Sequence, residues 1–426
     1  MSGGGGRARW QKARIILALV LIYFVFAILL NSVGTVILQS INSFGVSKTG
    51  ASVLEGFKDI SIAVVSFAVA SFLPRFGYRR AMIAALALVL AAALAMPAAN
   101  SFLATKIMFL ATGIGFALVK VSVYSTIGLI TGDRYQHAGL MNVIEGIFMI
   151  GVLAGYWLFG HFIGDGAQGD PGWLDVYYVL AALCALTIAL LLSTPFDGAR
   201  TLPRTQGLGE DFLGMLRLAL EPLVLLFVLS AFLYVLIEQG IGTWLPTFNN
   251  QVLKLPSAMS VQVASIFAAS LAVGRLGAGA ILRRVDWYPV LVACVLAMGT
   301  LVLLTLPLTR GLAPPAGDGW QHLPLAAFLL PLIGVFMAPV YPAINSAMLS
   351  ALPREKHSAM TGLIVIFSAL GGTTGSLITG FVFGHFDGQT AFYFSLLPMG
   401  AILVTLSLFR RALARHRVAP VSGLSS

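Results

Sequence analysis

The sequence predicts an all-α membrane protein with twelve transmembrane helices in two halves of six. Of its 426 residues, 58% are hydrophobic and only 10% are Asp, Glu, Lys or Arg, whereas soluble globular proteins carry roughly 25% charged residues. The mean hydropathy is +0.92. A helix needs about 20 apolar residues to cross a bilayer, and apolar runs of this kind recur along the whole chain. A soluble enzyme, a nucleic-acid binder and a disordered protein are therefore excluded.

Short polar breaks separate the twelve predicted helices. The first half holds residues 14–39, 51–74, 79–98, 102–128, 137–164 and 173–193, and the second half holds 219–247, 259–283, 286–309, 323–350, 357–385 and 390–412. The first run follows basic residues, as in a signal peptide, but it is too long for a signal peptide's apolar segment and no small-residue cleavage site follows it. We therefore expect it to remain as the first helix.

The positions of Lys and Arg predict that both termini are cytoplasmic. With the N-terminus inside, most of the 26 Lys and Arg residues fall on cytoplasmic segments, and only Lys48, Lys106, Lys254 and Arg310 fall on outer ones. An excess of Lys and Arg on cytoplasmic loops sets membrane topology, so the net charge of +10 reflects orientation and not affinity for nucleic acid. We expect a multi-pass protein of the inner, or plasma, membrane.

Two of the predicted helices carry stripes of uncharged polar residues. Asn31, Thr35 and Gln39 repeat every four residues on one face of the first helix, and Tyr341 and Asn345 do so in the tenth. Hydroxyl and amide groups can both donate and accept hydrogen bonds, which suits a polyhydroxylated ligand. We therefore predict that both stripes line a central substrate cavity. Hydrogen bonding between packed helices is the alternative.

Three charged residues lie together near the start of the second predicted helix. Glu55 and Asp59 are four residues apart and Lys58 follows Glu55 by three, so one helix face carries two carboxylates and an ammonium group. Each unpaired charge at the bilayer centre costs about 2.5–3.5 kcal/mol, which makes intramembrane charges functional candidates. We predict that this cluster binds and releases a proton as the lysine contact re-forms and breaks. A static ion-pair cluster is the alternative.

The fourth and fifth predicted helices carry one charge each. Lys120 and Glu145 flank the turn at 133–136, and their depths differ by only about 4–5 Å at the helical rise, so a direct ion pair is feasible. In the other interpretation, Lys120 reaches the central cavity together with Tyr124 and meets substrate oxygens, which would favour an anion. We expect the ion pair, and we include Lys120 and Tyr124 among the candidate substrate residues and Glu145 among the candidate proton-coupling residues.

The seventh predicted helix combines a charge with helix-loosening residues. Glu238 and Gln239 are followed by Gly240, Gly242 and Pro246. Discontinuous helices of this kind lie at the substrate sites of transporters. We predict that Glu238 and Gln239 contact substrate and that Glu238 also takes part in proton coupling. A structural hydrogen-bond network between the two halves is the alternative.

The longest polar interruption, residues 194–218, divides the chain into an N-terminal half (1–193) and a C-terminal half (219–426). A shift of 220 positions aligns Phe116 with Phe336, Arg134 with Arg354, His137 with His357, Gly151 with Gly371, Gly155 with Gly375 and Gly160 with Gly380. Parallel six-helix repeats are how major facilitator transporters are built. We interpret 194–218 as a cytoplasmic linker between two such repeats.

Three motifs resemble the fucose–proton symporter family of the major facilitator superfamily. They are YVLIEQGIGTWLPTF at residues 234–248, VGRLGAGAILRRVDWYPVL from Val273 and APVYPAINS from Ala338. They match that family's seventh helix, its eighth helix with the basic turn after it, and its proline-containing tenth helix, and they cover about a third of the chain. The resemblance implies transport of a sugar such as fucose, glucose or galactose, driven by protons.

The chain departs from that family at its two acidic positions. The sugar symporters it resembles carry an acidic residue in the first helix and another in the fourth, and the matching positions here are Asn31 and Lys120. The usual proton-carrying pair is therefore absent or has moved to other residues.

The basic loop after the second helix is retained as PRFGYRR, with Pro74 where the superfamily has an acidic residue. We predict a cytoplasmic gate of four arginines, Arg75, Arg79, Arg80 and Arg275. In this interpretation Arg275 lies near the cytoplasmic face, where it stabilises the gate or extends its charged group to the membrane surface.

The remaining patterns exclude other energy sources and sites. The sequence has no Walker A motif, so ATP-driven transport is not expected, and its six His and two Cys have no metal-ligand spacing. We expect no cofactor, no metal and no catalytic residue. The partners expected are a small-molecule substrate, protons and the lipid bilayer, for a monomer that binds no nucleic acid.

We predict a secondary active transporter of a sugar or sugar-like solute, coupled to protons and working by alternating access. Two alternatives stay open: a carrier of organic anions or exporter of amphiphilic compounds on the same fold, and a non-transporting membrane receptor or sensor.

Overall fold

The computed structural model describes residues 3–164, 170–194, 217–315, 319–353 and 356–418, together with residues 215 and 317. Within these residues the chain is helical and contains no strand. The N-terminal half consists of α1 (Gly3–Asn31), α2 (Val33–Phe44), α3 (Lys48–Ala51), α4 (Val53–Phe76), α5 (Tyr78–Ala99), α6 (Phe102–Ile130), α7 (Arg134–Phe162), η1 (Pro171–Asp175) and α8 (Val176–Leu192).

The C-terminal half follows the same plan with more interruptions. It consists of α10 (Pro222–Gly242), α11 (Leu245–Gln251), α12 (Ser257–Ile281), α13 (Trp287–Thr305), η2 (Leu306–Thr309), η3 (Trp320–His322), α14 (Ala326–Leu329), η4 (Leu330–Leu332), α15 (Ile333–Met337), α16 (Val340–Ala351), α17 (His357–His385), α18 (Gly388–Phe394) and α19 (Leu396–Val418). Most of the predicted linker at 194–218 lies outside the described residues, so the domain boundaries stay a prediction.

Eleven helical segments in the described part of the chain are long and apolar enough to cross a membrane. They coincide with eleven of the predicted spans. The remaining predicted span is α4, which carries Glu55, Lys58 and Asp59 in its first two turns and packs against α6 and α17. The predicted all-α architecture is confirmed, with α4 as the twelfth helix.

Local sequence explains where several helices begin and end. The side chain of Ser101 accepts a hydrogen bond from the Ala104 amide at the start of α6, and Asp133 accepts one from the Gln136 amide at the start of α7. Both satisfy amides that a helix N-terminus leaves without a partner. Between α4 and α5, Gly77 has a φ of 93°, a conformation that side chains disfavour.

Two of the predicted helices are each divided into two segments. The first run divides after Asn31, whose Nδ2 donates to the Ala27 carbonyl at 2.9 Å, and α2 continues from Val33. The seventh run divides into α10 and α11, with Pro246 in the first turn of α11. Proline is tolerated there because the first amides of a helix have no intrahelical acceptor. The predicted discontinuity of the seventh helix is confirmed.

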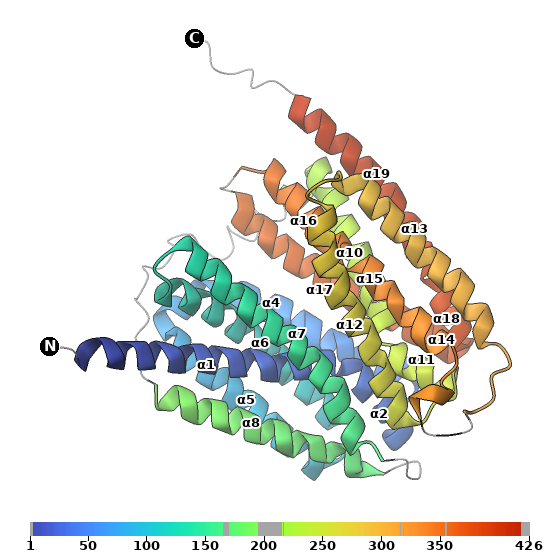
Figure 1. Cartoon of the computed structure of the whole chain (residues 1–426), viewed down its shortest axis with the longest axis horizontal. Coiled ribbons are helices and arrows are strands. Elements are labelled where there is room, and N and C mark those ends of the chain that lie inside the picture. The colour runs from blue at the N-terminus through green and yellow to red at the C-terminus, as the bar shows by residue number, and fades with distance from the viewer. Residues whose placement is uncertain are drawn as a thin grey trace.

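The two halves meet at one end of the molecule and diverge towards the other. Figure 1 shows them spreading from an apex near α2 and α11 towards the ends where α1 begins and α19 finishes. The halves contact each other through α4 with α17, α7 with α12, α2 with α11 and α3 with α17. We call the apex, formed by α2, α3 and α11, the junction end, and the opposite end the terminal end.

Polar and aromatic contacts hold the halves together at the junction end. Asn42 Nδ2 donates to Ser257 Oγ at 3.3 Å, and the rings of Trp157 and Trp320 stack at 5.8 Å with an interplanar angle of 7°. The Lys48 ammonium group lies 5.2 Å above the Phe383 ring. Each contact joins an N-terminal residue to a C-terminal one.

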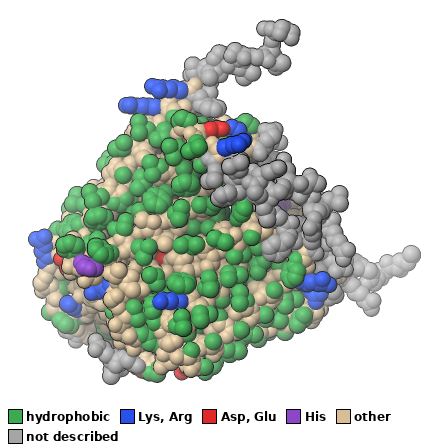
Figure 2. Space-filling model, turned by 180° about the vertical axis from the view of Figure 1, so that it is seen from behind, with side chains coloured by type: hydrophobic (Ala, Val, Ile, Leu, Met, Phe, Trp, Pro, Cys, Tyr) green, Lys and Arg blue, Asp and Glu red, His purple; other side chains and the backbone are tan. Residues whose placement is uncertain are grey.

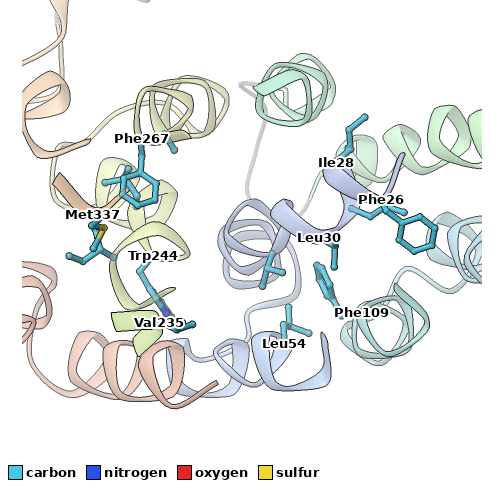
Figure 3. Packing of buried hydrophobic residues seen from close by; sticks show 14 of the residues in the cluster. Phe26, Ile28, Leu30, Leu54, Phe109, Val235, Trp244, Phe267 and Met337 are labelled. Carbon is cyan, nitrogen blue, oxygen red and sulfur yellow. The ribbon is translucent and has the colours of Figure 1, made fainter. Parts of the chain in front are cut away.

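Apolar side chains form the interior of each half and also cover its outside. In Figure 3, Phe26, Leu54 and Phe109 pack among the N-terminal helices, and Trp244 and Met337 pack among the C-terminal ones. Figure 2 shows hydrophobic side chains over most of the surface in view, with most charged side chains near its margins. An apolar outer surface of this extent is suited to lipid rather than water.

Candidate functional site

A cavity of about 150 Å³ lies between the two halves. It is bounded by α1, α2 and α4 near the junction end, and by α7, α10 and α12 along its sides. Eight polar or charged residues line it: Asn31, Glu55, Lys58, Tyr156, Glu238, Gln239, Thr243 and Arg275. The apolar part of the lining includes Phe148, Met149, Val152, Phe267 and Leu271.

Two residues of the predicted charge cluster of α4, Glu55 and Lys58, line the cavity at its junction end, and Asp59 is outside the lining. The Lys58 ammonium group contacts Glu55 Oε1 and lies 3.4 Å from Asp59 Oδ1. It also donates to the Leu30 carbonyl at 3.5 Å. Glu55 is 0% exposed and Lys58 is 5% exposed, and buried charges of this kind are stable only when paired. The predicted arrangement of two carboxylates around one ammonium group is confirmed.

Glu55 also reaches the C-terminal half. Its Oε2 accepts a hydrogen bond from Thr243 Oγ1 at 3.0 Å, and the same hydroxyl lies 3.1 Å from Gln239 Oε1. The backbones approach closely here, because a Cβ added to Gly34 of α2 would overlap with the Thr243 carbonyl oxygen. The α4 cluster is thus bonded directly to the discontinuous seventh helix.

Asp59 packs against the C-terminal half at a second point. A Cβ added to Gly372 of α17 would overlap with Asp59 Oδ2 and lie 3.2 Å from Gln239 Cγ. Only glycine leaves room for the carboxylate at this position. Both carboxylates of the cluster therefore contact the opposite half.

Glu238 and Arg275 lie in the same cavity as the α4 cluster. The Glu238 carboxyl group interacts with the charge of Arg275 and with the Tyr234 side chain. Arg275 contacts Met149 of the other half, with Nη1 and Sδ 3.6 Å apart. Glu238 and Gln239 both line the cavity, and their contact with substrate stays a prediction.

The predicted place of Arg275 in a cytoplasmic gate is wrong. Its side chain lines the central cavity together with Ala268 and Leu271, which precede it by seven and four residues on α12. These spacings put the three residues on one helix face. The position of Arg275 along the helix was predictable from the sequence, but the direction in which this face of α12 points was not.

The first-helix stripe lines the cavity only in part. Asn31 is in the lining, but Thr35 and Gln39 are 1% and 5% exposed. They lie in α2, one and two turns beyond Asn31, where the halves close on each other. The prediction that Thr35 and Gln39 line the cavity is wrong for this structure, because α2 continues into the junction end.

The tenth-helix stripe lies outside the cavity lining as well. Tyr341 bonds to Ser368 Oγ at 2.9 Å and stacks on Tyr234 at 5.6 Å. Asn345 Oδ1 is buried without a hydrogen-bond partner. The predicted contact of Tyr341 and Asn345 with the cavity is therefore wrong here, and Tyr341 instead supports α10 beneath Glu238.

Lys120 and Glu145 do not form the expected ion pair. The Tyr124 hydroxyl donates to Glu145 Oε1 at 2.7 Å, and the Lys120 ammonium group lies 5.9 Å from the centre of the Phe116 ring. Both charged side chains are exposed. Tyr124 is one helical turn beyond Lys120 on the same face of α6. It takes the place of Lys120 as the donor to the Glu145 carboxylate.

Two of the four predicted gate arginines, Arg79 and Arg80, can be followed in the described part of the second-helix loop. Arg79 donates to the carbonyls of Leu191 and Leu192 at 2.8 and 2.7 Å, so it caps the end of α8 within its own half. Arg80 is exposed, and the side chain of Arg75 lies outside the described residues. The halves are apart at the terminal end in this structure, so the gate role of these arginines stays a prediction.

Thr243 and Tyr156 are site residues that the sequence analysis missed. Thr243 follows Gln239 by four residues, which places both on one face of the seventh helix. Tyr156 shares a face of α7 with Glu145, Met149 and Val152, at intervals of four, three and four residues. These spacings were visible in the sequence, but such uncharged residues occur throughout the chain.

The charges of the cavity lining balance. Glu55 and Glu238 supply two negative charges, and Lys58 and Arg275 supply two positive ones. Among the described residues there is also no group of three or more His, Cys, Asp or Glu side chains that could hold a metal ion.

A cavity enclosed by two six-helix halves, charged inside and apolar outside, defines a membrane transport protein. The family model of the Major Facilitator Superfamily matches residues 17–314. The chain belongs to this superfamily. No curated protein sequence matches the chain.

Solved structures with the same fold include several different transporters. A mutant of the nucleoside transporter NupG superposes with a TM-score of 0.70 at 15% identity, covering 95% of this chain and 99% of NupG. A bacterial homologue of the human lysosomal transporter Spinster gives 0.69 at 16% identity, covering 96% and 99%. The transporter FucP in its outward conformation gives 0.60 at 15% identity, covering 94% and 99%. The expected resemblance to the fucose–proton symporter fold is thereby supported.

Proposed function

We propose that this chain is a proton-coupled secondary transporter of a neutral, polyhydroxylated solute, a sugar or sugar-like compound. The observation that carries the proposal is the cavity between the halves, whose lining holds two carboxylates and two cationic groups. Asp59, outside the lining, adds a second carboxylate to Lys58 of that lining. Such a site can hold an uncharged ligand at its centre while a titratable group beside it takes up a proton.

The lining favours a neutral solute with many hydroxyl groups. The amides of Asn31 and Gln239 and the hydroxyl of Tyr156 offer both donors and acceptors. Phe148 and Phe267 supply aromatic surface for the apolar face of a ring. A solute with a net negative charge would bring a third negative charge into a cavity whose lining has only two positive ones.

The cluster supports coupling to protons. One ammonium group lies between two carboxylates, so one negative charge is left uncompensated in a buried place. A proton taken up from cavity water would neutralise it. With the termini in the cytoplasm, as the Lys and Arg distribution predicts, this structure is closed to the outside and the cavity faces inwards.

An organic-anion carrier is the second candidate, and Lys120 is the observation that favours it. No carboxylate of the described residues lies within ion-pair distance of its ammonium group, which is exposed on α6. An anion that approached from the terminal end would meet this free positive charge.

Uptake into proteoliposomes tests the proposal. The purified chain would be reconstituted with an imposed proton gradient and offered radiolabelled fucose, glucose, galactose and glucuronate in parallel. We expect gradient-driven accumulation of at least one neutral sugar and none of glucuronate. Accumulation of glucuronate alone would establish the anion carrier, and binding without transport would establish a receptor.

Thermal unfolding supplies a second measurement for the same panel. A ligand at about 100 times its dissociation constant stabilises the folded state by about 2.7 kcal/mol. The solute that is accumulated should also give the largest stabilisation, because both effects come from occupation of the same cavity.

A further inference from the structure

We propose that Thr243 couples the protonation state of Glu55 to the orientation of the Gln239 amide. In this arrangement the cavity presents an amide acceptor when Glu55 is ionised and an amide donor when Glu55 is protonated. The inference rests on the proposed function, because it explains how a proton changes the binding groups of the same cavity.

The geometry around the Thr243 hydroxyl carries the inference. Its oxygen lies 3.0 Å from Glu55 Oε2 and 3.1 Å from Gln239 Oε1. A hydroxyl has one hydrogen to donate, whereas an ionised carboxylate and an amide oxygen are acceptors only. With Glu55 ionised, the Thr243 hydroxyl could therefore donate to only one of the two oxygens, Glu55 Oε2 or Gln239 Oε1. The other oxygen would face the hydroxyl with no hydrogen between them.

Two arrangements satisfy all three groups. When Glu55 is ionised, Thr243 donates to Glu55 Oε2, and Gln239 rotates its amide so that Nε2 donates to Thr243 and Oε1 turns to the cavity. When a proton from cavity water binds Glu55 Oε2, Glu55 would donate to Thr243 and Thr243 would donate to Gln239 Oε1, the amide atom that faces Thr243 at 3.1 Å in this structure. Gln239 Nε2 then turns to the cavity. The change needs only a rotation of the terminal amide, whose two ends have nearly the same size.

The surroundings of Glu55 leave its Oε2 as the oxygen that accepts the proton. Its Oε1 is held by Lys58, so protonation at Oε2 preserves the ion-pair contact. The titratable and charged groups that share the cluster or the cavity lining with Glu55 are Lys58 and Asp59 on α4, Tyr156 on α7, Glu238 on α10 and Arg275 on α12. Arg275 and Glu238 offset each other, and Lys58 is shared by two carboxylates, which leaves one negative charge for the proton.

The consequence for a solute follows from the position of Gln239 in the cavity lining. A hydroxyl group bound there must donate to Gln239 in one state and accept from it in the other. The proton and the solute therefore affect each other through a single side chain. Thr243 is a positioning residue in this relay, because it acts through Glu55 and Gln239.

Infrared difference spectroscopy of the full-length protein in lipid vesicles, titrated with acid and without any solute, tests the relay. Glu55→Gln identifies the carboxyl band of Glu55, and Gln239→Met identifies the amide band of Gln239. We expect the amide band to shift together with the carboxyl band. Thr243→Val should keep the carboxyl band but reduce the amide shift by about fivefold or more, and Thr243→Ser, which keeps the hydroxyl, should restore it.

An amide shift of wild-type size in Thr243→Val would overturn the relay, and so would the absence of a titrating Glu55 band in the wild-type protein. If Thr243→Val does not fold, Thr243→Cys replaces it, because a thiol is a weak donor and should give a reduced shift. Since no solute is present, this result is separate from the uptake assay. Failure to accumulate any sugar would overturn the proposed function and leave the relay standing.

Discussion

Lys58 lies between two carboxylates, and one ammonium group can neutralise only one of them. The contacts of Lys58 with Glu55 and Asp59 therefore set up a competition inside a region that excludes most water. A surplus buried charge is costly, and binding a proton is the simplest way to remove it. The proton-coupling hypothesis depends on this surplus charge and not on the identity of either acid alone.

Replacing one acid should uncouple transport from the proton gradient. Asp59→Asn removes the surplus charge, so Glu55 and Lys58 remain as a neutral pair that has no reason to bind a proton. We expect gradient-driven uptake of the accumulated sugar to be lost, while exchange of labelled for unlabelled sugar, which needs no net proton movement, persists. Asp133→Asn is the matched control, because Asn also caps a helix. Undiminished gradient-driven uptake in Asp59→Asn would rule out the cluster as the proton site.

Lys120 separates the two candidate substrate classes. Lys120→Gln keeps the length of a polar side chain and removes the charge. If the solute is neutral, uptake should change less than about twofold, because Lys120 is not in the cavity lining and its ammonium group is not held by Glu145. A much larger loss with glucuronate than with neutral sugars would instead support the anion carrier. Lys106→Gln, which removes a positive charge from the same helix α6 outside the candidate site, is the matched control.

Contacts within one helix were predictable from the sequence, and contacts between the halves were not. Glu55, Lys58 and Asp59 are near neighbours on α4, so helical spacing alone placed them together. The partner of Glu55 is Thr243, which is 188 positions away. The same limit explains Lys120, whose expected partner was taken by Tyr124, since the choice between two donors depends on side-chain directions that spacing does not give.

At the scale of helices, breaks decide which residues face the cavity. Gly240, Gly242 and Pro246 marked the α10–α11 break in the sequence, because glycine and proline weaken helices. The break between α1 and α2 lies beside Asn31, Ser32 and Gly34 but has no proline, and residues 14–39 were predicted as one continuous helix. Thr35 and Gln39 are buried because the two halves close on each other at their level along the helix. Only the packed structure shows where this closure lies.

Gly34 of α2 lies against the Thr243 carbonyl at the C-terminal end of α10, and a larger residue should weaken that contact. Gly34→Ala adds a Cβ that overlaps with the Thr243 carbonyl oxygen, and overpacking of this kind costs about 1–3 kcal/mol. We expect a lower thermal unfolding midpoint for the purified protein. Gly146→Ala on α7 is the matched control, because nothing lies within 4 Å of its added Cβ and alanine favours a helix. An equal effect of both variants would contradict this account of the α2–α10 contact.

At the scale of the whole molecule, the junction end closes the cavity. It is also the place where the Glu55–Lys58–Asp59 cluster meets the C-terminal half. Opening this end would break Glu55–Thr243, Asn42–Ser257 and Trp157–Trp320 together, because each joins residues of different halves. The seal and the titratable group are therefore one structural unit. Under the proposed function, this unit would tie the uptake of a proton to the closing of the outer end.

Locking the junction end should stop transport without unfolding the protein. Asn42→Cys with Ser257→Cys places thiols where Nδ2 and Oγ lie 3.3 Å apart across the halves, and a short bifunctional thiol reagent would join them. Because alternating access needs this end to open, we expect cross-linked proteoliposomes to lose sugar uptake and to recover it on reductive cleavage of the linker. Ser43→Cys with Asp170→Cys, a contact within the N-terminal half at the same end, should be cross-linked without loss. Transport that persists through the Asn42–Ser257 cross-link would show that the halves need not separate here, and would count against alternating access around this cavity.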